Sequence, residues 1–147
     1  MTASSLQTEW APGHPLAIVR EAGQGGSAVV LEAISGTGTR LALKVGHGPE
    51  MAPVLAAEAR LAIVSQHAGM PQVRWCGWVQ RDGGSILVVQ RGAAFALPAL
   101  AMDWVQGAAL GGAELDEPDA LGIVRDLAST LAALHAAGWA HGDVSLA

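Results

Sequence analysis

Apolar residues in the first half of the chain come in short runs, and glycine-rich turns separate these runs. The runs cover residues 16–22, 29–34 and 41–45, and the turns fill 23–28 and 35–39. Each run has the length and the β-branched content that are typical of a strand. The pattern therefore predicts an antiparallel meander at the start of the fold.

The spacing of apolar residues becomes helical after residue 50. Over 51–67, apolar or small side chains recur at intervals of three and four, and the sequence Ala-Gly-Met-Pro then ends the pattern. Strand-like runs return at 73–80, 85–90 and 97–105, with an Arg-Asp-Gly-Gly turn after the first of them. We therefore predict one helix between two groups of strands.

A second long helix is predicted at about 118–137, after a linker over 106–117. Asp116 and Glu117 precede Pro118, and Gly138 follows the last apolar position, which is typical start and stop chemistry for a helix. The predicted fold class is α+β. It comprises a mostly antiparallel sheet of five strands or slightly more, one helix packed on it, and one long helix after the linker.

Composition narrows the classes of partner. The chain of 147 residues and 14.9 kDa carries a net charge of −5 and has no basic run that could follow a nucleic-acid backbone. Its 51% apolar content includes no continuous uncharged stretch long enough to span a membrane, and no secretory signal precedes residue 15. Cys76 is the only cysteine, which favours a reducing compartment such as the cytoplasm. We therefore expect neither nucleic acid nor a membrane as partner.

The glycine-rich turn at 23–28 is a weak signal by itself, because any tight turn can require glycine. A dinucleotide-binding fold is disfavoured, since the β-branched residues that follow the turn do not open a helix. A hairpin loop with free backbone N–H groups could instead lie over an anion such as a polyphosphate. A purely structural turn remains the alternative.

Lys44 is the only lysine, and it stands in the otherwise apolar run 41–45. If that run is buried on both faces, the ammonium requires a partner of opposite charge. Glu58 is the matching acid, because the predicted helix places it among apolar positions 51, 54, 55, 61, 62 and 65. We predict a buried ion pair between the two. The alternatives are an edge-strand lysine and a partly exposed, unpartnered glutamate.

These features occur together in one known fold. Gly23-x-Gly25-x-x-Ala28-x-Val30, Leu41-Ala42-Leu43-Lys44, helix Glu58 and His141-Gly142-Asp143 follow one another in the order and rough spacing of the protein-kinase fold. From residue 16 to 147 the chain resembles the N-terminal lobe of a bacterial Ser/Thr protein kinase. The resemblance divides the chain into an N-terminal extension (1–15), the ATP-binding lobe (16–106) and the hinge exit with the start of the C-terminal lobe (107–147).

The resemblance implies roles for individual residues. Lys44 would reach the α- and β-phosphates of ATP and pair with Glu58, and Asp143 would accept the proton of the substrate hydroxyl. Met102 would be the gatekeeper residue beside the adenine. The remaining implied nucleotide contacts are Gly23, Gly25, Gly26, Ser27 and Val30 in the glycine-rich loop, Ala42 against the adenine ring, and the backbones of Asp103 and Val105 in the hinge.

The sequence also departs from the kinase pattern. Ala28 replaces the third glycine, and Gly142 replaces the arginine of His-Arg-Asp, as in small-molecule kinases related to aminoglycoside phosphotransferases. Ser145 stands where a phosphate-contacting lysine is usual. The sequence contains neither an asparagine nor an Asp-Phe-Gly triplet, so the Mg²⁺ ligands of the family are absent from these residues. We predict no metal site in this chain, with Mg²⁺ bound only in the complete enzyme.

The first functional hypothesis is the ATP-binding portion of a Ser/Thr protein kinase-like phosphotransferase. A noncatalytic pseudokinase module that binds a partner protein and a small-molecule kinase are the alternatives. We expect the chain to be a fragment, a natural truncation or half of a split enzyme, and to be inactive alone. An exposed apolar stripe on the last helix (Leu121, Val124, Leu127, Leu131, Leu134) predicts a homodimer. His14, His47, His67 and His135 are interpreted as surface or capping residues.

Overall fold

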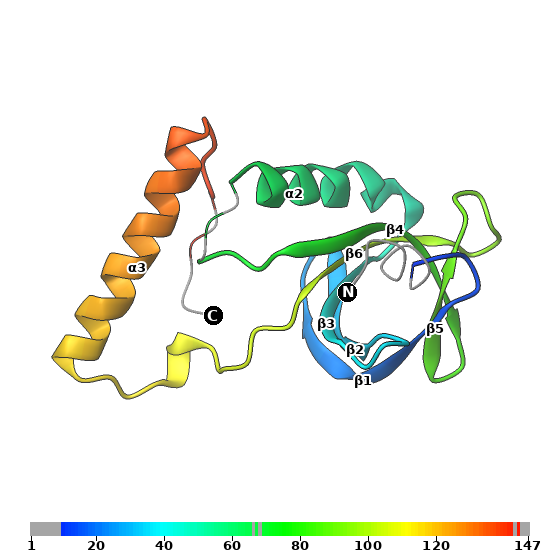
Figure 1. The fold of residues 1–147 in the computed structure, drawn as a ribbon, viewed down its shortest axis with the longest axis horizontal. Coiled ribbons are helices and arrows are strands. Elements are labelled where there is room, and N and C mark those ends of the chain that lie inside the picture. The colour runs from blue at the N-terminus through cyan, green and yellow to red at the C-terminus, as the bar shows by residue number, and fades with distance from the viewer. Residues whose placement is uncertain (1–9, 66, 68, 143, 145–147) are drawn as a thin grey trace.

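The computed structural model describes residues 10–65, 67, 69–142 and 144, and its main element is a strongly curved antiparallel sheet (Figure 1). Every strand predicted from the sequence is present, within a few residues of its expected ends. The strands are β1 (Pro15–Gln24), β2 (Ala28–Ile34), β3 (Arg40–Gly46), β4 (Val73–Asp82), β5 (Ser85–Val89) and β6 (Leu97–Asp103).

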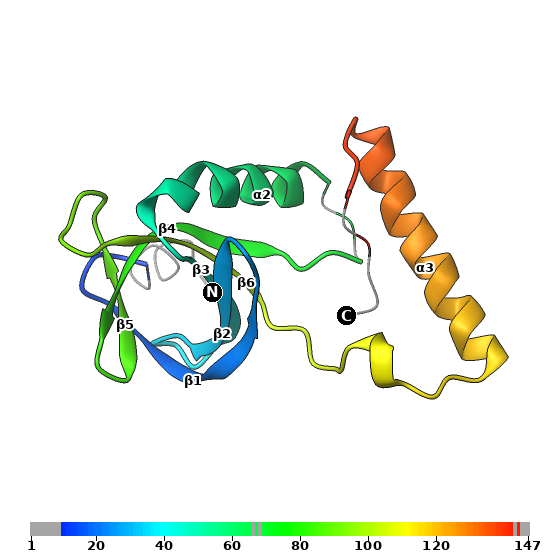
Figure 2. The ribbon, with the colours of Figure 1, turned by 180° about the vertical axis from the view of Figure 1, so that it is seen from behind.

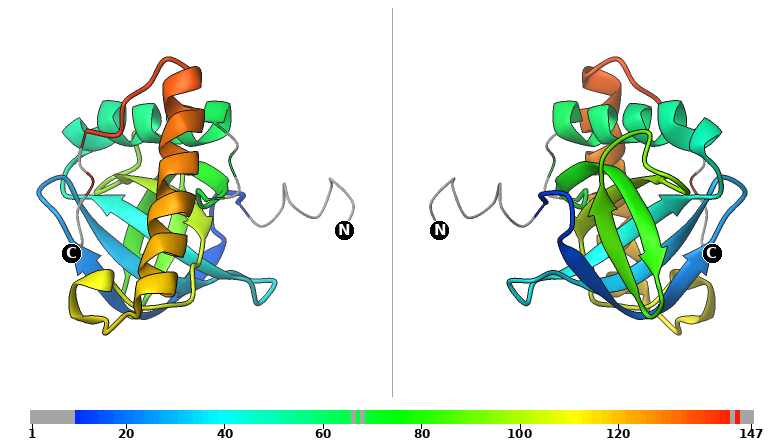
Figure 3. Two further views of the ribbon diagram at one scale, coloured as in Figure 1. Left: turned by 90° about the vertical axis from the view of Figure 1, so that its left-hand side faces the viewer. Right: turned by 90° about the vertical axis from the view of Figure 1, so that its right-hand side faces the viewer.

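The sheet closes on itself into a barrel of six strands, a closure that the predicted antiparallel sheet of five strands or slightly more did not include. Its six strands follow the order β1-β2-β3-β6-β4-β5, and β1 returns to pair with β5. This last pairing is short and joins Pro15, Leu16 and Ala17 to Leu87, Ile86 and Ser85. Register shifts in β1 after Ile18 and after Glu21 bend that strand around the barrel. The view in Figure 3 shows the strands wrapping around a common axis.

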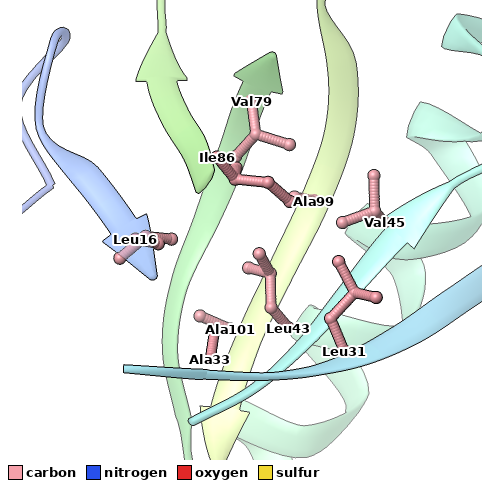
Figure 4. Close-up of a cluster of buried hydrophobic side chains, with 9 residues drawn as sticks. All are labelled: Leu16, Leu31, Ala33, Leu43, Val45, Val79, Ile86, Ala99 and Ala101. Atoms are coloured by element: carbon pink, nitrogen blue, oxygen red, sulfur yellow. The ribbon is translucent and has the colours of Figure 1, made fainter. Parts of the chain in front are cut away.

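Side chains that alternate along the strands fill the barrel (Figure 4). In β3, Leu43 and Val45 point inward, and Ala99 and Ala101 do so from the neighbouring β6. The complete buried cluster consists of Leu16, Leu31, Ala33, Leu43, Val45, Val79, Ile86, Ala99 and Ala101. The alternate residues of the same strands therefore lie on the outer face, and this face carries the candidate site.

Helix α2 (Ala52–Ser65) follows the short helix η1 (Pro49–Met51) and packs across β4 and β6 (Figure 1). Leu55 and Ala59 are its buried residues, and Val54 is 48% exposed. The packed face is therefore centred one position further around the helix than the sequence indicated. Glu58 consequently lies at the border of this face and not in its middle.

Helix α3 (Glu117–Ala136) begins as predicted, with the Asp116 carboxylate accepting from the backbone N–H of Asp119 at 2.9 Å. Residues 104–116, which include the short helix η2 (Leu110–Gly112), join it to β6 (Figure 2). The C-terminal end of α3 lies near the end of α2, and there His67 contacts Thr130, with Nδ1 3.2 Å from Oγ1.

The predicted apolar stripe of α3 is only partly exposed. Leu121, Val124 and Leu127 are exposed, whereas Leu131 is half-buried and Leu134 is 1% exposed. Burial of Leu134 corrects that part of the prediction, and it follows from packing at the C-terminal end of the helix. None of the helices in the described part of the chain combines the length and the hydropathy that a membrane span requires.

Candidate nucleotide-binding site

The pairing of β2, β3 and β6 gathers four of the predicted site residues on the outer face of the barrel. Val30 is paired with Lys44, and Ala42 is paired with Met102. Residues directly opposite each other in an antiparallel pair share a face, as do residues two apart in one strand. All four side chains are half-buried. They therefore form a continuous, partly open surface with Lys44 at one end and Met102 at the other.

Lys44 forms the predicted ion pair with Glu58. Its ammonium nitrogen lies 2.8 Å from Oε2 of Glu58, within charge-assisted hydrogen-bond distance. The pair joins β3 to α2 across 14 residues of sequence. A fixed ammonium at the edge of an apolar surface is suited to bind an anionic group of a ligand that also has an aromatic part.

The surroundings of this pair are more open than the sequence indicated. The Lys44 side chain is 24% exposed and the Glu58 side chain is 36% exposed. Run 41–45 is buried on its core face only, because Ala42 and Lys44 leave the strand on the outer face. The prediction of a fully buried pair is therefore wrong, while the predicted pairing itself is confirmed.

The glycine-rich loop connects β1 to β2, and Gly23 belongs to the end of β1. Gly23, Gly25 and Gly26 all lack the positive φ that would require glycine. A Cβ atom on Gly23 or Gly26 would meet nothing within 4 Å, and one on Gly25 would meet only the Ala28 oxygen at 3.9 Å. Neither a positive φ nor internal packing requires glycine at these positions, and the open space beside the loop leaves room for a ligand to approach the backbone closely.

Some backbone N–H groups of this loop form hydrogen bonds within the protein and others do not. Gly25 N–H donates to Ala28 O at 2.9 Å, which closes the turn. The N–H groups of Gly26 and Ser27 have no partner in the part of the chain that the structure describes. Two neighbouring backbone donors without protein partners form a concave surface suited to an anion.

Two interactions fix the hinge at the other end of the surface. Asp103 N–H donates to Gln72 O at 3.0 Å, which ties the end of β6 to the segment before β4. Arg74 donates two hydrogen bonds to the Asp103 carboxylate, from Nε to Oδ1 at 2.5 Å and from Nη2 to Oδ2 at 3.1 Å. This hydrogen bonding raises the pKa of Arg74. Val105 follows two residues later and is 66% exposed, so its backbone lies at the rim.

A profile of the phosphotransferase enzyme family (APH) matches residues 18–144. The chain belongs to this family. No curated protein matches the sequence. A solved structure with a similar fold is the crystal structure of Rad53 1-466 in complex with AMP-PNP, with a TM-score of 0.62 and 19% identity. The match covers 89% of this chain and 33% of that one, so this member of the family spans about one third of the kinase chain it resembles.

The family and the fold confirm the predicted kinase-like architecture. The α+β arrangement of this phosphotransferase is that of the N-terminal portion of a kinase-like fold, with the barrel, α2 and α3 in the expected order. Asp143, the predicted catalytic base, lies outside the described residues. Within those residues, no group of three His, Cys, Asp or Glu side chains could hold a metal ion. The roles assigned to individual residues stay predictions.

The sequence analysis did not predict the charged cluster of Glu32, Arg20 and Arg40 beside the site. Glu32 is 4% exposed, and its carboxylate contacts Arg20 Nε at 2.7 Å and Arg40 Nε at 3.2 Å. The Arg20 guanidinium also lies 5.3 Å from the ring centre of Trp104 in the hinge. Opposite charges on three consecutive strands were the available signal, because Arg20 faces Glu32 across β1 and β2 and Arg40 lies diagonally from it on β3.

One cavity lined by described residues is distinct from the Lys44 end of this surface. It has a volume of about 910 Å³ and lies between the end of α2, segment 69–74 and the hinge. It shares Asp103 and Val105 with the candidate site but does not include Lys44. The ion pair and the glycine-rich loop therefore lie on an open face and not in this cavity.

Proposed function

We propose that this phosphotransferase chain binds ATP on the outer face of its barrel and supplies the nucleotide-binding part of an enzyme that transfers the γ-phosphate to a hydroxyl group. The 2.8 Å pair of Lys44 and Glu58 is the observation that carries the proposal. It places one fixed positive charge beside an apolar surface, and a loop with free N–H donors leads into the neighbouring strand β2. A positive charge and N–H donors beside an apolar surface match a nucleoside triphosphate, which has a flat base and an anionic phosphate chain.

Each part of the surface has a distinct task in this proposal. Lys44 neutralises charge on the α- and β-phosphates, and Glu58 holds the ammonium in one position so that little rotational freedom is lost on binding. The N–H groups of Gly26 and Ser27 donate to phosphate oxygens, since glycine lets the backbone approach them closely.

The adenine contacts lie at the other end of the surface. Ala42 and Met102 are paired across β3 and β6 and offer the adenine a flat apolar contact. The Asp103 carbonyl and the Val105 N–H read the polar edge of the base. Because Arg74 holds the Asp103 side chain, this backbone is already ordered before the nucleotide arrives.

The proposed acceptor is a protein Ser or Thr hydroxyl, by resemblance to the bacterial kinases. A small-molecule hydroxyl is the second candidate, and two observations favour it. His141-Gly142-Asp143 lacks the arginine of the protein kinases, and the matched family is that of phosphotransferase enzymes. In either case Mg²⁺ would have ligands outside this chain, and Asp143 is the proposed base for the hydroxyl proton.

Calorimetric titration of the purified chain with ATP and with AMP-PNP tests the nucleotide site. We expect saturable binding that Lys44→Met weakens at least tenfold. The matched control is Arg125→Met, because the Arg125 side chain is 80% exposed on α3 and, among the described residues, forms an ion pair only with its neighbour Asp126. Absence of saturable binding at millimolar nucleotide would refute the proposal, as would equal affinities for wild type and Lys44→Met.

The acceptor requires an assay of the complete enzyme that contains this chain. Transfer of γ-labelled phosphate to Ser/Thr peptides supports the first candidate, and transfer to aminoglycosides or other small hydroxyl compounds supports the second. Asp143→Asn should abolish transfer in both cases. If the complete enzyme binds ATP and transfers phosphate to neither class, the pseudokinase alternative takes the place of both.

A further inference from the structure

His47 contacts the glycine-rich loop through both its backbone and its side chain. Its N–H donates to Ser27 O at 3.1 Å, and its Nε2 lies 2.8 Å from Gly25 O. Because a carbonyl oxygen can only accept, the Nε2 atom carries the proton and donates it. His47, the residue that follows β3, therefore binds two of the three carbonyls in the loop 25–27.

These bonds decide which groups the loop offers to a ligand. Together with the bond from Gly25 N–H to Ala28 O, they occupy the carbonyls of Gly25, Ser27 and Ala28. The C=O and N–H of one trans peptide point in opposite directions. With the Gly25 carbonyl turned toward His47, the Gly26 N–H therefore points away from His47.

The direction away from His47 is that of the Lys44 face. Lys44 leaves β3 on the outer face, and Val45 leaves it toward the core. His47 lies one residue beyond the end of β3, and its N–H bond to Ser27 O continues the register of the β2–β3 ladder by one pair. Alternation continued over this pair would place His47 on the side opposite Lys44. His47 thus binds the loop on the side away from Lys44. The bonded carbonyls of Gly25 and Ser27 therefore do not face the proposed phosphate position.

The backbone that carries His47 is itself fixed. A Cβ atom on the preceding Gly46 would lie 2.9 Å from Met51 Cβ and 2.9 Å from Pro98 Cγ. Only glycine allows the end of β3 to pass this closely between η1 and β6. His47 therefore follows directly after a tightly packed point of the barrel.

We propose that His47 is a positioning residue of the nucleotide site, which holds the glycine-rich loop so that its N–H groups face the phosphates of the bound nucleotide. This inference rests on the proposed function for its ligand, while its effect on the loop can be measured without a ligand. The histidine touches no reacting atom and acts only through the backbone of Gly25 and Ser27.

The first experiment compares the affinities for ATP and adenosine by calorimetry in wild type, His47→Ala and His47→Gln. A lost hydrogen bond corresponds to roughly a three- to tenfold change in affinity, so His47→Ala should weaken ATP by that factor and leave adenosine unchanged. His47→Gln should restore most of the ATP affinity, because its amide N–H₂ can donate to the same carbonyl. His14→Ala is the control, because His14 is an exposed histidine immediately before β1.

An equal loss for ATP and adenosine, or an unchanged ATP affinity in His47→Ala, would overturn the inference. The second experiment measures amide hydrogen exchange at Gly25 in the ligand-free chain. His47→Ala should accelerate this exchange several-fold, and His47→Gln should not. If the wild type binds neither ligand but Gly25 exchange responds as expected, the nucleotide proposal fails and the loop-holding role stands. Unchanged exchange in His47→Ala refutes the role itself.

Discussion

Replacing Lys44 by methionine removes the charge that joins β3 to α2 and keeps the apolar stem of the side chain. An exposed ion pair contributes about 0.2–1 kcal/mol, whereas loss of one partner from a buried pair costs about 3–5 kcal/mol. With side chains 24% and 36% exposed, Lys44 and Glu58 lie between these cases. We expect Lys44→Met to lower the free energy of unfolding by about 1–2 kcal/mol.

The expected loss corresponds to a decrease in Tm of roughly 3–10 °C for a chain of this size. Urea unfolding of wild type, Lys44→Met, Glu58→Gln and the double variant gives a double-mutant cycle. We expect a coupling energy of about 1 kcal/mol, because each single variant already loses the same contact. The Arg125 and Asp126 pair, at 3.4 Å with side chains 80% and 77% exposed, is the control and should show almost no coupling.

A coupling energy for Lys44 and Glu58 as small as that of the control pair would refute this reasoning. It would mean that α2 is held on the barrel by apolar packing such as that of Leu55 and Ala59, and that the ammonium is not fixed before a ligand binds. A loss of more than about 3 kcal/mol in Lys44→Met would contradict it in the other direction, since only a fully buried pair behaves in that way.

Further outcomes test other contacts. A Cβ on Gly69 would lie 2.1 Å from Thr130 Oγ1, so Gly69→Ala should destabilise the chain by about 1–3 kcal/mol in urea, and adding Thr130→Ala should restore most of the loss. Glu32→Gln should cost about 1–3 kcal/mol by thermal unfolding, because a buried carboxylate serves two arginines; an unchanged Tm would contradict this. Desolvation raises the pKa of the Cys76 thiol, so alkylation near neutral pH should be slower than in the unfolded chain, and the difference should shrink as pH rises through the raised pKa. If a second copy covers the exposed side of α3, sedimentation at micromolar concentration will show a dimer, and a soluble monomer would refute the predicted homodimer.

Local pattern was sufficient to predict the elements and one long-range contact. The strands and helices followed from spacing and turn residues, since these reflect which side chains can be buried. The pair of Lys44 and Glu58 could be predicted because each is a charge in an apolar run, and two such charges require each other.

The features that the sequence did not predict depend on geometry that spacing does not determine. Closure of the barrel needs β1 to meet β5, and no local signal identifies a partner so distant in sequence. Exposure of Lys44 and Glu58 depends on which way α2 is rotated on the sheet, and a broad apolar stripe allows more than one rotation. His47 is a surface residue, as predicted, but its bonds to the carbonyls of Gly25 and Ser27 were not predicted, because every residue has a backbone carbonyl and no sequence pattern marks such partners.

The pairing of β1 with β5 has a consequence for how the chain folds. The barrel closes only when residues 15–17 pair with residues 85–87, and β3 gains its second neighbour only when β6 pairs with it. Contacts so distant in sequence slow folding, because the loop entropy is lost before the contacts form. During synthesis the β1-β2-β3 hairpins can form early, but both outer strands expose unpaired backbone groups until β5 and β6 arrive. We therefore expect truncations that end before residue 97 to aggregate through these edges, while chains that include β6 remain protected.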